Sequence, residues 1–372
     1  MKKIKILHLT FNMSFGGTEQ VIRHLVKYTD NKVYDVSIIC LDNYIGELGK
    51  ELLKNNTKIT AFDRNTKGFD FRLVGKLHKY LIINKIDIIH CHQYTPYTYG
   101  LFASLWTDTA VIFTEHGRFY PDRFKWKRII LNRLLCVKTN AITAISKSTA
   151  NALNKYENIP LSKIQIIYNG IAVPINNNQS ALEIRNQLNI KQDSLILGTV
   201  SRLDPIKNQK LIIESFKNIL IEYPQAILVI VGDGPLMSEL VTYVENLNIT
   251  TKVIFTGFKV NPYKYINIFD VFLLSSFSEG TSMTLLEAMA HSKPCVVTDV
   301  GGNSEIVIND ITGYITPSND LLKFTQSIHK LLCNTHLRKT MGESGRKRFE
   351  THFTVNQMID SYQKLYISLK SN

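Results

Sequence analysis

Two glutamates eight positions apart, Glu279 and Glu287, have the spacing that most directly suggests chemistry. They enclose a glycine, two hydroxyl residues and an apolar run in the stretch SEGTSMTLLEAMA. We expect Gly280 to allow a tight turn after a strand, and Thr281 or Ser282 to cap a helix that runs to about His291. The unpaired N–H groups at the start of such a helix form a site for a phosphate or a diphosphate.

The second glutamate stands beyond that anion site. Glu287 follows Ser282 by five residues, about 7.5 Å along a helix that rises ~1.5 Å per residue. A nucleotide-sugar would fit, with its sugar near Glu279, its diphosphate at the helix start, where Met283 lies, and its ribose hydroxyls near Glu287. The pattern by itself equally describes an ordinary amphipathic helix with a solvated glutamate at each end.

Length and composition favour a two-domain globular protein. The chain has 372 residues, of which 44% are hydrophobic, enough for about two domains with sizeable cores. Its five cysteines are scattered without a CxxC pair, which suits a reducing cytosol and argues against a disulfide framework or a zinc ribbon. No stretch approaches ~18 consecutive apolar residues, and the basic, apolar start lacks a cleavage site, so we expect neither a membrane span nor a signal peptide.

The net charge of +13 suggests an anionic partner, unless it reflects compositional drift towards lysine. An anionic membrane, an anionic substrate and a nucleic acid are the classes to consider. No helix-turn-helix, RRM, KH or zinc-finger pattern occurs in the sequence, so we do not expect a nucleic-acid partner.

Short apolar segments alternate with amphipathic ones along both halves of the chain, which predicts parallel sheets covered by helices. A segment rich in proline and asparagine, 173–193, separates the two sets and is expected to be a linker. We therefore place one domain at 1–172, a second at 194–350, and a closing helical segment at 351–372.

The first turn of the chain is a candidate phosphate corner. Gly16 and Gly17 follow the predicted strand 3–10, and Thr18 is expected to cap the next helix. The dinucleotide fingerprint GxGxxG is absent, because only these two adjacent glycines occur. A tight strand-to-helix turn without a ligand explains the pattern equally well.

Three histidines stand at the predicted carboxyl ends of strands in the first half. His90 and His92 lie on one face of the strand 87–92, and His116 follows the strand 110–114. Strand ends of this kind face the ligand crevice of an open α/β sheet. His90 and His92 could bind a metal, although no third ligand is in view, contact an acceptor, or simply pack. His116 alone is as consistent with a structural role as with a functional one.

The segment Arg118–Lys138 combines seven basic residues with aromatic and apolar ones. A basic helix with aromatic flanks is typical of a membrane-surface helix, and we expect it to attach to an anionic leaflet. The other interpretation is a solvated helix that packs its Leu/Ile face on the sheet.

In the second half, Arg202 and Lys207 flank the turn between the predicted strand 195–200 and the helix 209–221. Two cations beside a helix start suit a departing diphosphate, although a solvated loop also explains them. Another turn, at Gly257 and Phe258, follows the predicted strand 252–255.

Taken together, these stretches resemble the retaining GT-B glycosyltransferases of the family 4 type over nearly the whole chain. The motifs that carry the resemblance are EGTSMTLLEAMA, AISKST, IIYNGI, SRLDPIKN and GGNSEI, with a closing helix like RKRFETHFTVNQMIDSYQKLY. The chain departs from the family pattern at Ser201, where a glycine is usual, and at Ala172, where an acidic residue is usual.

The resemblance implies an α/β GT-B fold: two Rossmann-like domains facing across a deep cleft, with the C-terminal helix crossing back to the first. It also implies a retaining, metal-independent transfer from a UDP- or GDP-sugar to a glycan or polyprenol-linked acceptor, in bacterial surface polysaccharide synthesis. No cofactor or metal is expected, and the protein would be cytoplasmic, on the inner face of the membrane. A nucleotide-sugar epimerase, a phosphorylase and a non-catalytic adaptor are the alternatives.

The resemblance assigns roles to the candidate residues. Arg202 and Lys207 would hold the diphosphate, Glu287 the ribose, and Glu279 and His116 the sugar. The remaining donor-side residues would be Gly16 and Gly17 near the sugar–phosphate junction, Gly257 and Phe258 near the base, and Gly280, Thr281, Ser282 and Met283 at the helix start. His90 and His92 would lie on the acceptor side.

Overall fold

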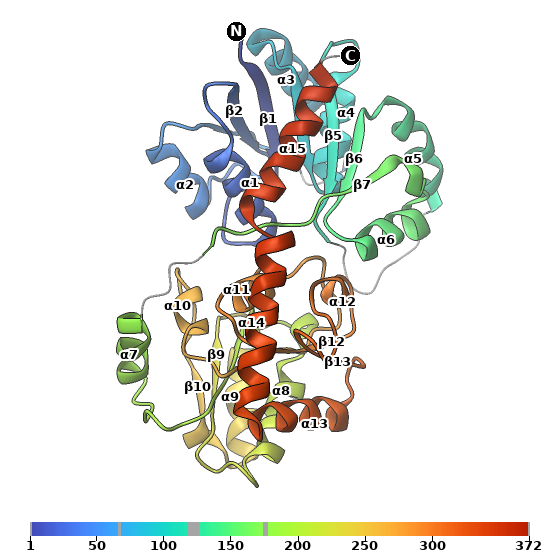
Figure 1. The fold of residues 1–372 in the computed structure, drawn as a ribbon. Coiled ribbons are helices and arrows are strands. Elements are labelled where there is room, and N and C mark those ends of the chain that lie inside the picture. Colours follow the sequence, from blue (N-terminus) through green and yellow to red (C-terminus); the bar gives the residue numbers. More distant parts are fainter. Residues whose placement is uncertain (1, 66–67, 118–125, 174–177, 371–372) are drawn as a thin grey trace. The chain divides into compact units, whose positions relative to one another are not determined.

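The computed structural model describes residues 2–65, 68–117, 126–173 and 178–370 (Figure 1). The chain divides into two compact units. Unit 1 comprises Met1–Gly170 together with Val355–Asn372, and unit 2 comprises Ile171–Thr354. The C-terminal helix thus belongs to the same unit as the N-terminus, as the GT-B fold requires.

Unit 1 is built on a seven-stranded sheet with the order β3-β2-β1-β4-β5-β6-β7, in which every pairing is parallel. The strands are β1 (Ile4–Thr10), β2 (Tyr34–Cys40), β3 (Lys58–Ala61), β4 (Ile88–His92), β5 (Ala110–Glu115), β6 (Ala141–Ala144) and β7 (Ile164–Ile166). Its helices are α1 (Gly17–Tyr28), α2 (Glu47–Lys54), α3 (Phe71–Asn84), α4 (Tyr94–Ser104), α5 (Trp126–Lys138), α6 (Lys147–Glu157) and α15 (Val355–Lys370).

The two faces of this sheet differ in chemistry. Leu7, Leu9, Ile89 and Phe113 belong to one buried apolar cluster with residues of α3 and α4. The alternate residues of the same strands point to the opposite face, and there the central strands carry histidine and threonine. Tyr362 and Tyr366 of α15 are fully buried against that second face.

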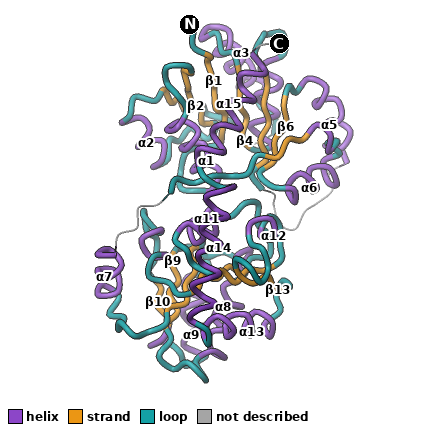
Figure 2. Tube along the Cα trace, in the orientation of Figure 1, coloured by secondary structure: helices purple, strands orange, loops and turns teal. Residues whose placement is uncertain are grey.

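Unit 2 has a six-stranded parallel sheet with the order β10-β9-β8-β11-β12-β13. The strands are β8 (Ile196–Val200), β9 (Ile227–Val231), β10 (Val253–Phe255), β11 (Val271–Leu274), β12 (Cys295–Thr298) and β13 (Gly313–Thr316). Its helices are α7 (Asn178–Gln187), α8 (Gln209–Ile219), α9 (Met237–Asn246), α10 (Tyr263–Ile266), α11 (Met283–Ala290), α12 (Asn303–Ile306), α13 (Leu321–Leu332) and α14 (Thr335–His352). Figure 2 shows the same alternation of strands and helices in both units.

Both sheets reverse their strand order once, between β1 and β4 in unit 1 and between β8 and β11 in unit 2. Open α/β sheets bind ligands outside the carboxyl ends of the strands at such a switch point. The loops after these four strands are therefore where a site is expected. The candidate residues Gly17, His92, Lys207 and Glu279 lie in these loops or directly beside them.

Two local expectations have opposite outcomes. Ser282 caps α11 by accepting from the N–H of Leu285 (3.4 Å), as its place before an apolar helical run predicts. Thr18 does not cap α1: the cap residue is Gly16, in an extended conformation and without a side-chain bond. The Thr18 hydroxyl instead accepts from the amide of Gln93 (3.3 Å), and the helix begins two residues earlier than a cap at Thr18 predicts.

No helix among the described residues is long and apolar enough to cross a bilayer. Of the basic segment 118–138, residues 118–125 lie outside the described part, and α5 covers the rest.

Candidate functional site

The loop after β8 forms a short structured turn at the switch point of unit 2. Asp204 caps the 3₁₀ turn Pro205–Lys207 by accepting from the N–H of Ile206 (3.1 Å). Asn208 then takes the left-handed conformation, with φ of 48°, and α8 begins directly after it. This turn places Lys207 at the carboxyl edge of the sheet.

The loop after β11 is bonded to that turn. The Ser275 hydroxyl donates to the carbonyls of Lys207 (2.9 Å) and Asn208 (2.8 Å). The N–H of Phe277 donates to the carbonyl of Ile206 (2.7 Å). The main-chain bond of Phe277 and the Ser275 hydroxyl therefore hold together the loops on both sides of the switch point.

The predicted residues Lys207 and Glu279 form an ion pair, with Nζ of Lys207 2.7 Å from Oε1 of Glu279. The same oxygen accepts from the hydroxyl of Ser276 (2.6 Å). The Glu279 side chain is only 7% exposed and that of Lys207 is 24% exposed. The sequence assigned these residues to different parts of a donor, whereas the structure shows that Glu279 also positions Lys207.

A glycine corner after β12 supports the glutamate loop. The N–H of Gly302 donates to the carbonyl of Gly280 (3.0 Å). Gly301 has a φ of 55°, and a Cβ at this position would overlap the carbonyl oxygen of Glu279. Only glycine fits both the left-handed backbone and this close approach.

Glu287 has a carboxylate oxygen that is available to a ligand. Its Oε2 is buried and has no hydrogen-bond partner within the described residues, and burial raises the pKa of Glu287 to about 7. A buried acceptor without a partner costs ~1–3 kcal/mol, and a donor from a bound molecule would remove that cost. Glu287 lies on α11, five residues after the cap Ser282.

The remaining unit 2 candidates are more exposed. The Arg202 side chain is 73% exposed and its Nε lies 3.8 Å from Oδ2 of Asp204. Gly257 has a φ of 68° and accepts from the N–H of Gly232 (3.1 Å), and Phe258 is 51% exposed. Thr281, by contrast, is buried beside the cap.

In unit 1, α1 starts at Gly17, and the space beside Gly17 is open because a Cβ there would have no neighbour within 4 Å. Gln93, which follows β4, has φ of 71° and ψ of 165°. That region of backbone space is essentially restricted to glycine, and such strain clusters at functional sites. No local pattern in the sequence pointed to Gln93 other than its position after His92.

His92 and His116 belong to a hydrogen-bonded chain of rings. Nε2 of His116 lies 2.8 Å from Nδ1 of His92, and Nε2 of His92 lies 2.9 Å from Nδ1 of His8. His90 stacks beside them, with one nitrogen 2.8 Å from the Tyr366 hydroxyl and the other 2.6 Å from the Thr114 hydroxyl.

Burial keeps these rings neutral at ordinary pH. It lowers the pKa of His8 and of His116 to about 3, and the pKa of His90 and His92 falls well below 6.5. His90 and His92 are 0% exposed. The ring nitrogens of both residues are hydrogen-bonded inside the unit, which agrees with a packing role, and their place on the acceptor side stays a prediction.

Comparison with known proteins agrees with this geometry. Residues 15–173 match the family described as Glycosyltransferase Family 4, and residues 180–348 match Glycosyl transferases group 1. The chain belongs to the group 1, family 4 type of glycosyltransferases. The two matched regions together cover most of both units.

Individual relatives of this glycosyltransferase span its length. It is 25% identical to the UDP-Gal:alpha-D-GlcNAc-diphosphoundecaprenol alpha-1,3-galactosyltransferase of Escherichia coli, over 100% of this chain and 98% of that protein. It is 33% identical to the N-acetylgalactosamine-N,N'-diacetylbacillosaminyl-diphospho-undecaprenol 4-alpha-N-acetylgalactosaminyltransferase of Campylobacter jejuni, over 62% of this chain and 61% of that one. The crystal structure of Anabaena HepE in complex with UDP matches with a TM-score of 0.87 and 20% identity, over 98% of this chain and 100% of that one, which establishes the GT-B fold.

A metal site in this glycosyltransferase has one candidate among the described residues. Nitrogens of His8, His90 and His92 lie within 4.8 Å of one another. His8 is the third ligand that the sequence did not reveal, because it lies on a different strand. Both nitrogens of His90 already have hydroxyl partners, and both nitrogens of His92 bond to other histidines, so these two rings would each have to give up a hydrogen bond to bind a metal.

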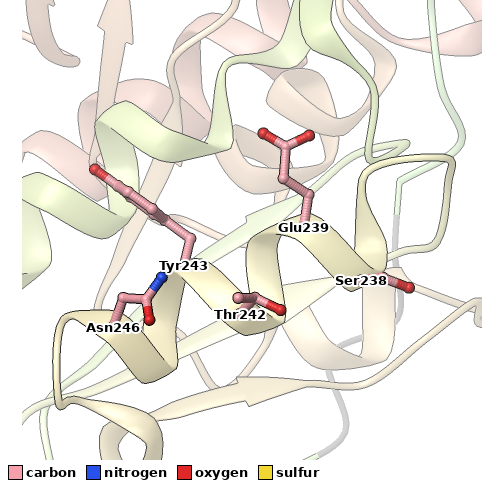
Figure 3. A pocket seen from close by; sticks show the side chains of 5 residues that line it. All are labelled: Ser238, Glu239, Thr242, Tyr243 and Asn246. Carbon is pink, nitrogen blue, oxygen red and sulfur yellow. The ribbon is translucent and has the colours of Figure 1, made fainter.

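A hollow of about 380 Å³ lies along α9, and neither Lys207 nor Glu279 lines it. Figure 3 shows its five lining side chains, Ser238, Glu239, Thr242, Tyr243 and Asn246, on that one helix. Its carboxylate, Glu239, is paired with Lys210 (2.6 Å). None of the predicted site residues belongs to this hollow.

Proposed function

We propose that this glycosyltransferase is a retaining, metal-independent enzyme that moves a sugar from a UDP- or GDP-sugar to a glycan or polyprenol-linked acceptor. The observation that carries the donor assignment is the corner of unit 2, where Lys207 and Glu279 pair beside the start of a capped helix. A cation and unpaired helix N–H groups are suited to a diphosphate.

Within this corner, Lys207 and the N–H groups at the start of α11 neutralise the charge that develops on the departing diphosphate. The exposed guanidinium of Arg202 would add a second cation once it turns towards the ligand. Glu287 accepts from the ribose hydroxyls with its unpartnered Oε2. These groups supply the positive charge that a metal ion provides in other transferases, which supports metal independence.

The proposal of retention rests on the family resemblance, and the paired state of Glu279 bears only on the route. A carboxylate already bonded to Lys207 and Ser276 is a poor candidate for a nucleophile. We therefore assign same-face transfer through an ion-pair-like complex, with His116 and Glu279 orienting the sugar.

The acceptor proposal comes from the relatives. The E. coli and C. jejuni enzymes both carry diphosphoundecaprenol in their names, and this chain is similar to each. A sugar on a polyprenyl diphosphate is therefore the acceptor class to test first, and it would place the enzyme in bacterial surface polysaccharide synthesis.

A lipid-linked acceptor agrees with attachment to the inner face of the membrane. On α5, Leu134 is 66% exposed and Val137 is 72% exposed. At 100° per residue they share one side of the helix with the exposed Arg133 and Lys138. Exposed apolar and basic side chains on one helical face are typical of an interfacial helix.

Arg128, however, is not available to a lipid headgroup. It lies 3.3 Å from Oε1 of Glu157, and its guanidinium lies 3.7 Å from the centre of the Tyr94 ring. The sequence counted it among the membrane-facing cations, whereas the structure uses it inside unit 1.

The donor proposal is tested by thermal unfolding with UDP, GDP and ADP, since a nucleotide that binds the folded state raises the melting temperature. We expect a shift with UDP or GDP. Transfer from the corresponding nucleotide-sugar, followed by NMR of the new anomeric centre, then tests retention, and full activity in EDTA tests metal independence. A protein that binds none of the nucleotides would contradict the proposed function.

Membrane attachment is tested by sedimentation with vesicles that contain phosphatidylglycerol. Replacing Arg133 and Lys138 by glutamate, and Leu134 by serine, should abolish binding without disturbing the internal pair of Arg128. The Lys217→Glu variant, at an exposed position of α8 in unit 2, is the control for charge alone. Binding that survives the α5 changes would reject this surface.

A further inference from the structure

A polar layer runs across one face of the sheet in unit 1. His8 pairs with His90 in the parallel register, His92 pairs with Thr114, and Thr114 pairs with Thr143. Residues paired in this way point to the same face. The layer thus brings three imidazoles from β1 and β4 beside threonine hydroxyls from β5 and β6.

Two kinds of contact order the rings. His90 is clamped between the hydroxyls of Tyr366 and Thr114, and Thr114 is bonded in turn to Thr143 (2.5 Å). His90 packs on His92 with ring centres 4.2 Å apart. The other three rings, His116, His92 and His8, form a single line of hydrogen bonds.

That line has a direction. A neutral imidazole carries one N–H, which donates, and one bare nitrogen, which accepts. His92 bonds at both nitrogens, so it donates to one neighbour and accepts from the other. All three rings must therefore carry the proton on the same type of nitrogen, either Nε2 in every ring or Nδ1 in every ring.

Two considerations favour protonation at Nε2. It is the more stable tautomer of neutral histidine, and in this line all three rings adopt it together. It also leaves His116 with a bare Nδ1. That nitrogen is buried without a partner in the described part of the chain, and a buried N–H without a partner is rarer in proteins than an unfilled acceptor.

We propose that His8 and His92 are positioning residues that fix His116 in its Nε2–H tautomer, so that its Nδ1 accepts a hydrogen bond from a sugar hydroxyl. His116 follows β5 at the carboxyl edge of the sheet, where a ligand is expected. The identity of the ligand as a sugar rests on the proposed function, whereas the tautomer does not depend on it. No proton is transferred. The line of hydrogen bonds leaves Nδ1 of His116 unprotonated, so that it can accept, and holds the His116 ring in place.

The tautomer is measured directly on the full-length protein labelled with ¹⁵N-histidine, by long-range ¹H–¹⁵N correlation at pH 7. His8→Gln, His92→Gln and His116→Gln variants assign the signals. We expect three neutral rings, each protonated at Nε2. A charged ring, or a proton on Nδ1 of His116, would overturn the proposal. So would a stoichiometric shift of the His8, His90 and His92 signals with Zn²⁺, which would identify a metal site instead.

Binding and activity test the second part. Saturating UDP-glucose or UDP-galactose, whichever binds, should shift the Nδ1 signal of His116, whereas UDP alone should not. A shift with UDP alone, or none with the sugar nucleotide, would contradict the sugar contact. If none of UDP, GDP and ADP binds, the proposed function fails while the tautomer result stands.

Substitution separates positioning from folding. His92→Phe should lower kcat/KM about tenfold, the effect of one lost hydrogen bond, with unchanged affinity for UDP, and His92→Gln should recover most of the loss because its amide can both donate and accept. The control is His24→Gln, another buried histidine of unit 1, whose Nδ1 bonds to the carbonyl of Gly170 (3.2 Å). Equal activity in His92→Phe and wild type would overturn the role, and if His92→Phe does not fold, the wild-type spectra still decide the tautomer.

Discussion

The two units share one strand order but place their polar groups differently. In unit 2, aliphatic residues such as Leu197, Leu228 and Leu273 fill the core around the sheet, and the candidate residues Lys207 and Glu279 follow the carboxyl ends of its strands. In unit 1, the polar groups lie within the sheet itself, as the layer around His90. Loops held by main-chain bonds can present charges to a ligand, whereas rings inside a sheet must stay neutral.

The largest effect should come from the charged corner of unit 2. Lys207→Ala removes the cation that we assign to the departing diphosphate, and we expect kcat to fall about 10²–10³-fold, as when one transition-state donor is removed. The transfer assay measures it. The matched control is Lys210→Ala. Lys210 forms a similar ion pair with Glu239 (2.6 Å), but the side chains of Lys210 and Glu239 are 47% and 53% exposed. If the Lys207 variant kept activity within a few-fold of wild type, the charged corner of unit 2 would have no part in the mechanism.

Lowering the pH should destabilise unit 1 more than unit 2. The pKa of each buried histidine of unit 1 is lower in the folded state than the unfolded value of ~6.5, so the stability it contributes is complete above pH 6.5 and is lost as pH falls towards the folded pKa. Each such ring contributes at most ~1.4 kcal/mol per pH unit in that window. His24, with a pKa of about 4, adds to His116 and the three rings of the layer. The raised pKa of Glu19 acts in the opposite direction and offsets the effect of about one ring.

In unit 2 the corresponding effects nearly cancel. Burial lowers the pKa of His291 to about 4 and raises that of Glu287 to about 7. Between pH 4.5 and 6.5 the first group loses stability as pH falls and the second gains it. Hydrogen exchange, corrected for its intrinsic pH dependence, should therefore show unit 1 opening first between pH 6.5 and 4. Equal loss of protection in both units would contradict the contrast.

Most of the fold could be predicted from the sequence because strands buried on both faces are short apolar runs. The five strands placed from the sequence are confirmed to within one residue at one end: 3–10, 87–92, 110–114, 195–200 and 252–255. The cap Ser282 was visible for a local reason, a hydroxyl residue before an apolar helical run. β13 was missed, since GYIT is short and follows a glycine turn.

The site could be predicted less completely, because contacts between distant segments cannot be inferred from local sequence patterns. His8 joins the line only through the register of β1 on β4, and the bond between Lys207 and Glu279 joins segments 72 positions apart. The strained backbone conformation of Gln93 could not be predicted from the residue types. The sequence therefore indicated the edges where a ligand is expected, but not the side-chain contacts that form there.

A third prediction compares the glycine corners of the two units. Gly301→Ala should lower the free energy of unfolding by ~1–3 kcal/mol. A φ of 55° is unfavourable for a residue with a Cβ, and that Cβ would overlap the carbonyl of Glu279. Gly17→Ala should change stability by no more than ~1 kcal/mol, since the space there is open. Urea unfolding measures both. If Gly17→Ala keeps its stability but loses activity, that space is used by a ligand, and unchanged activity would show that the corner is only a turn.

The smallest effect should appear in nucleotide binding as a function of pH. With a pKa of about 7, Glu287 is largely protonated below neutrality and must lose its proton to accept from both ribose hydroxyls. Affinity should then rise with pH by at most tenfold per unit below pH 7 and level off above it. Calorimetry with a UDP-sugar that binds measures this, because its diphosphate does not titrate in the range.

Glu287→Gln is the matched variant for this measurement. It keeps the shape of the side chain and an acceptor oxygen but has no proton to lose, so its affinity should not change between pH 5.5 and 8. The same pH dependence in wild type and variant would assign the titration to another group and leave Glu287 without a place at the ribose. A flat profile in both proteins would mean that the Glu287 carboxyl is already exposed to water before the nucleotide binds. The region around Glu287 in unit 2 would then open readily at neutral pH, whereas the sheet of unit 1 resists opening.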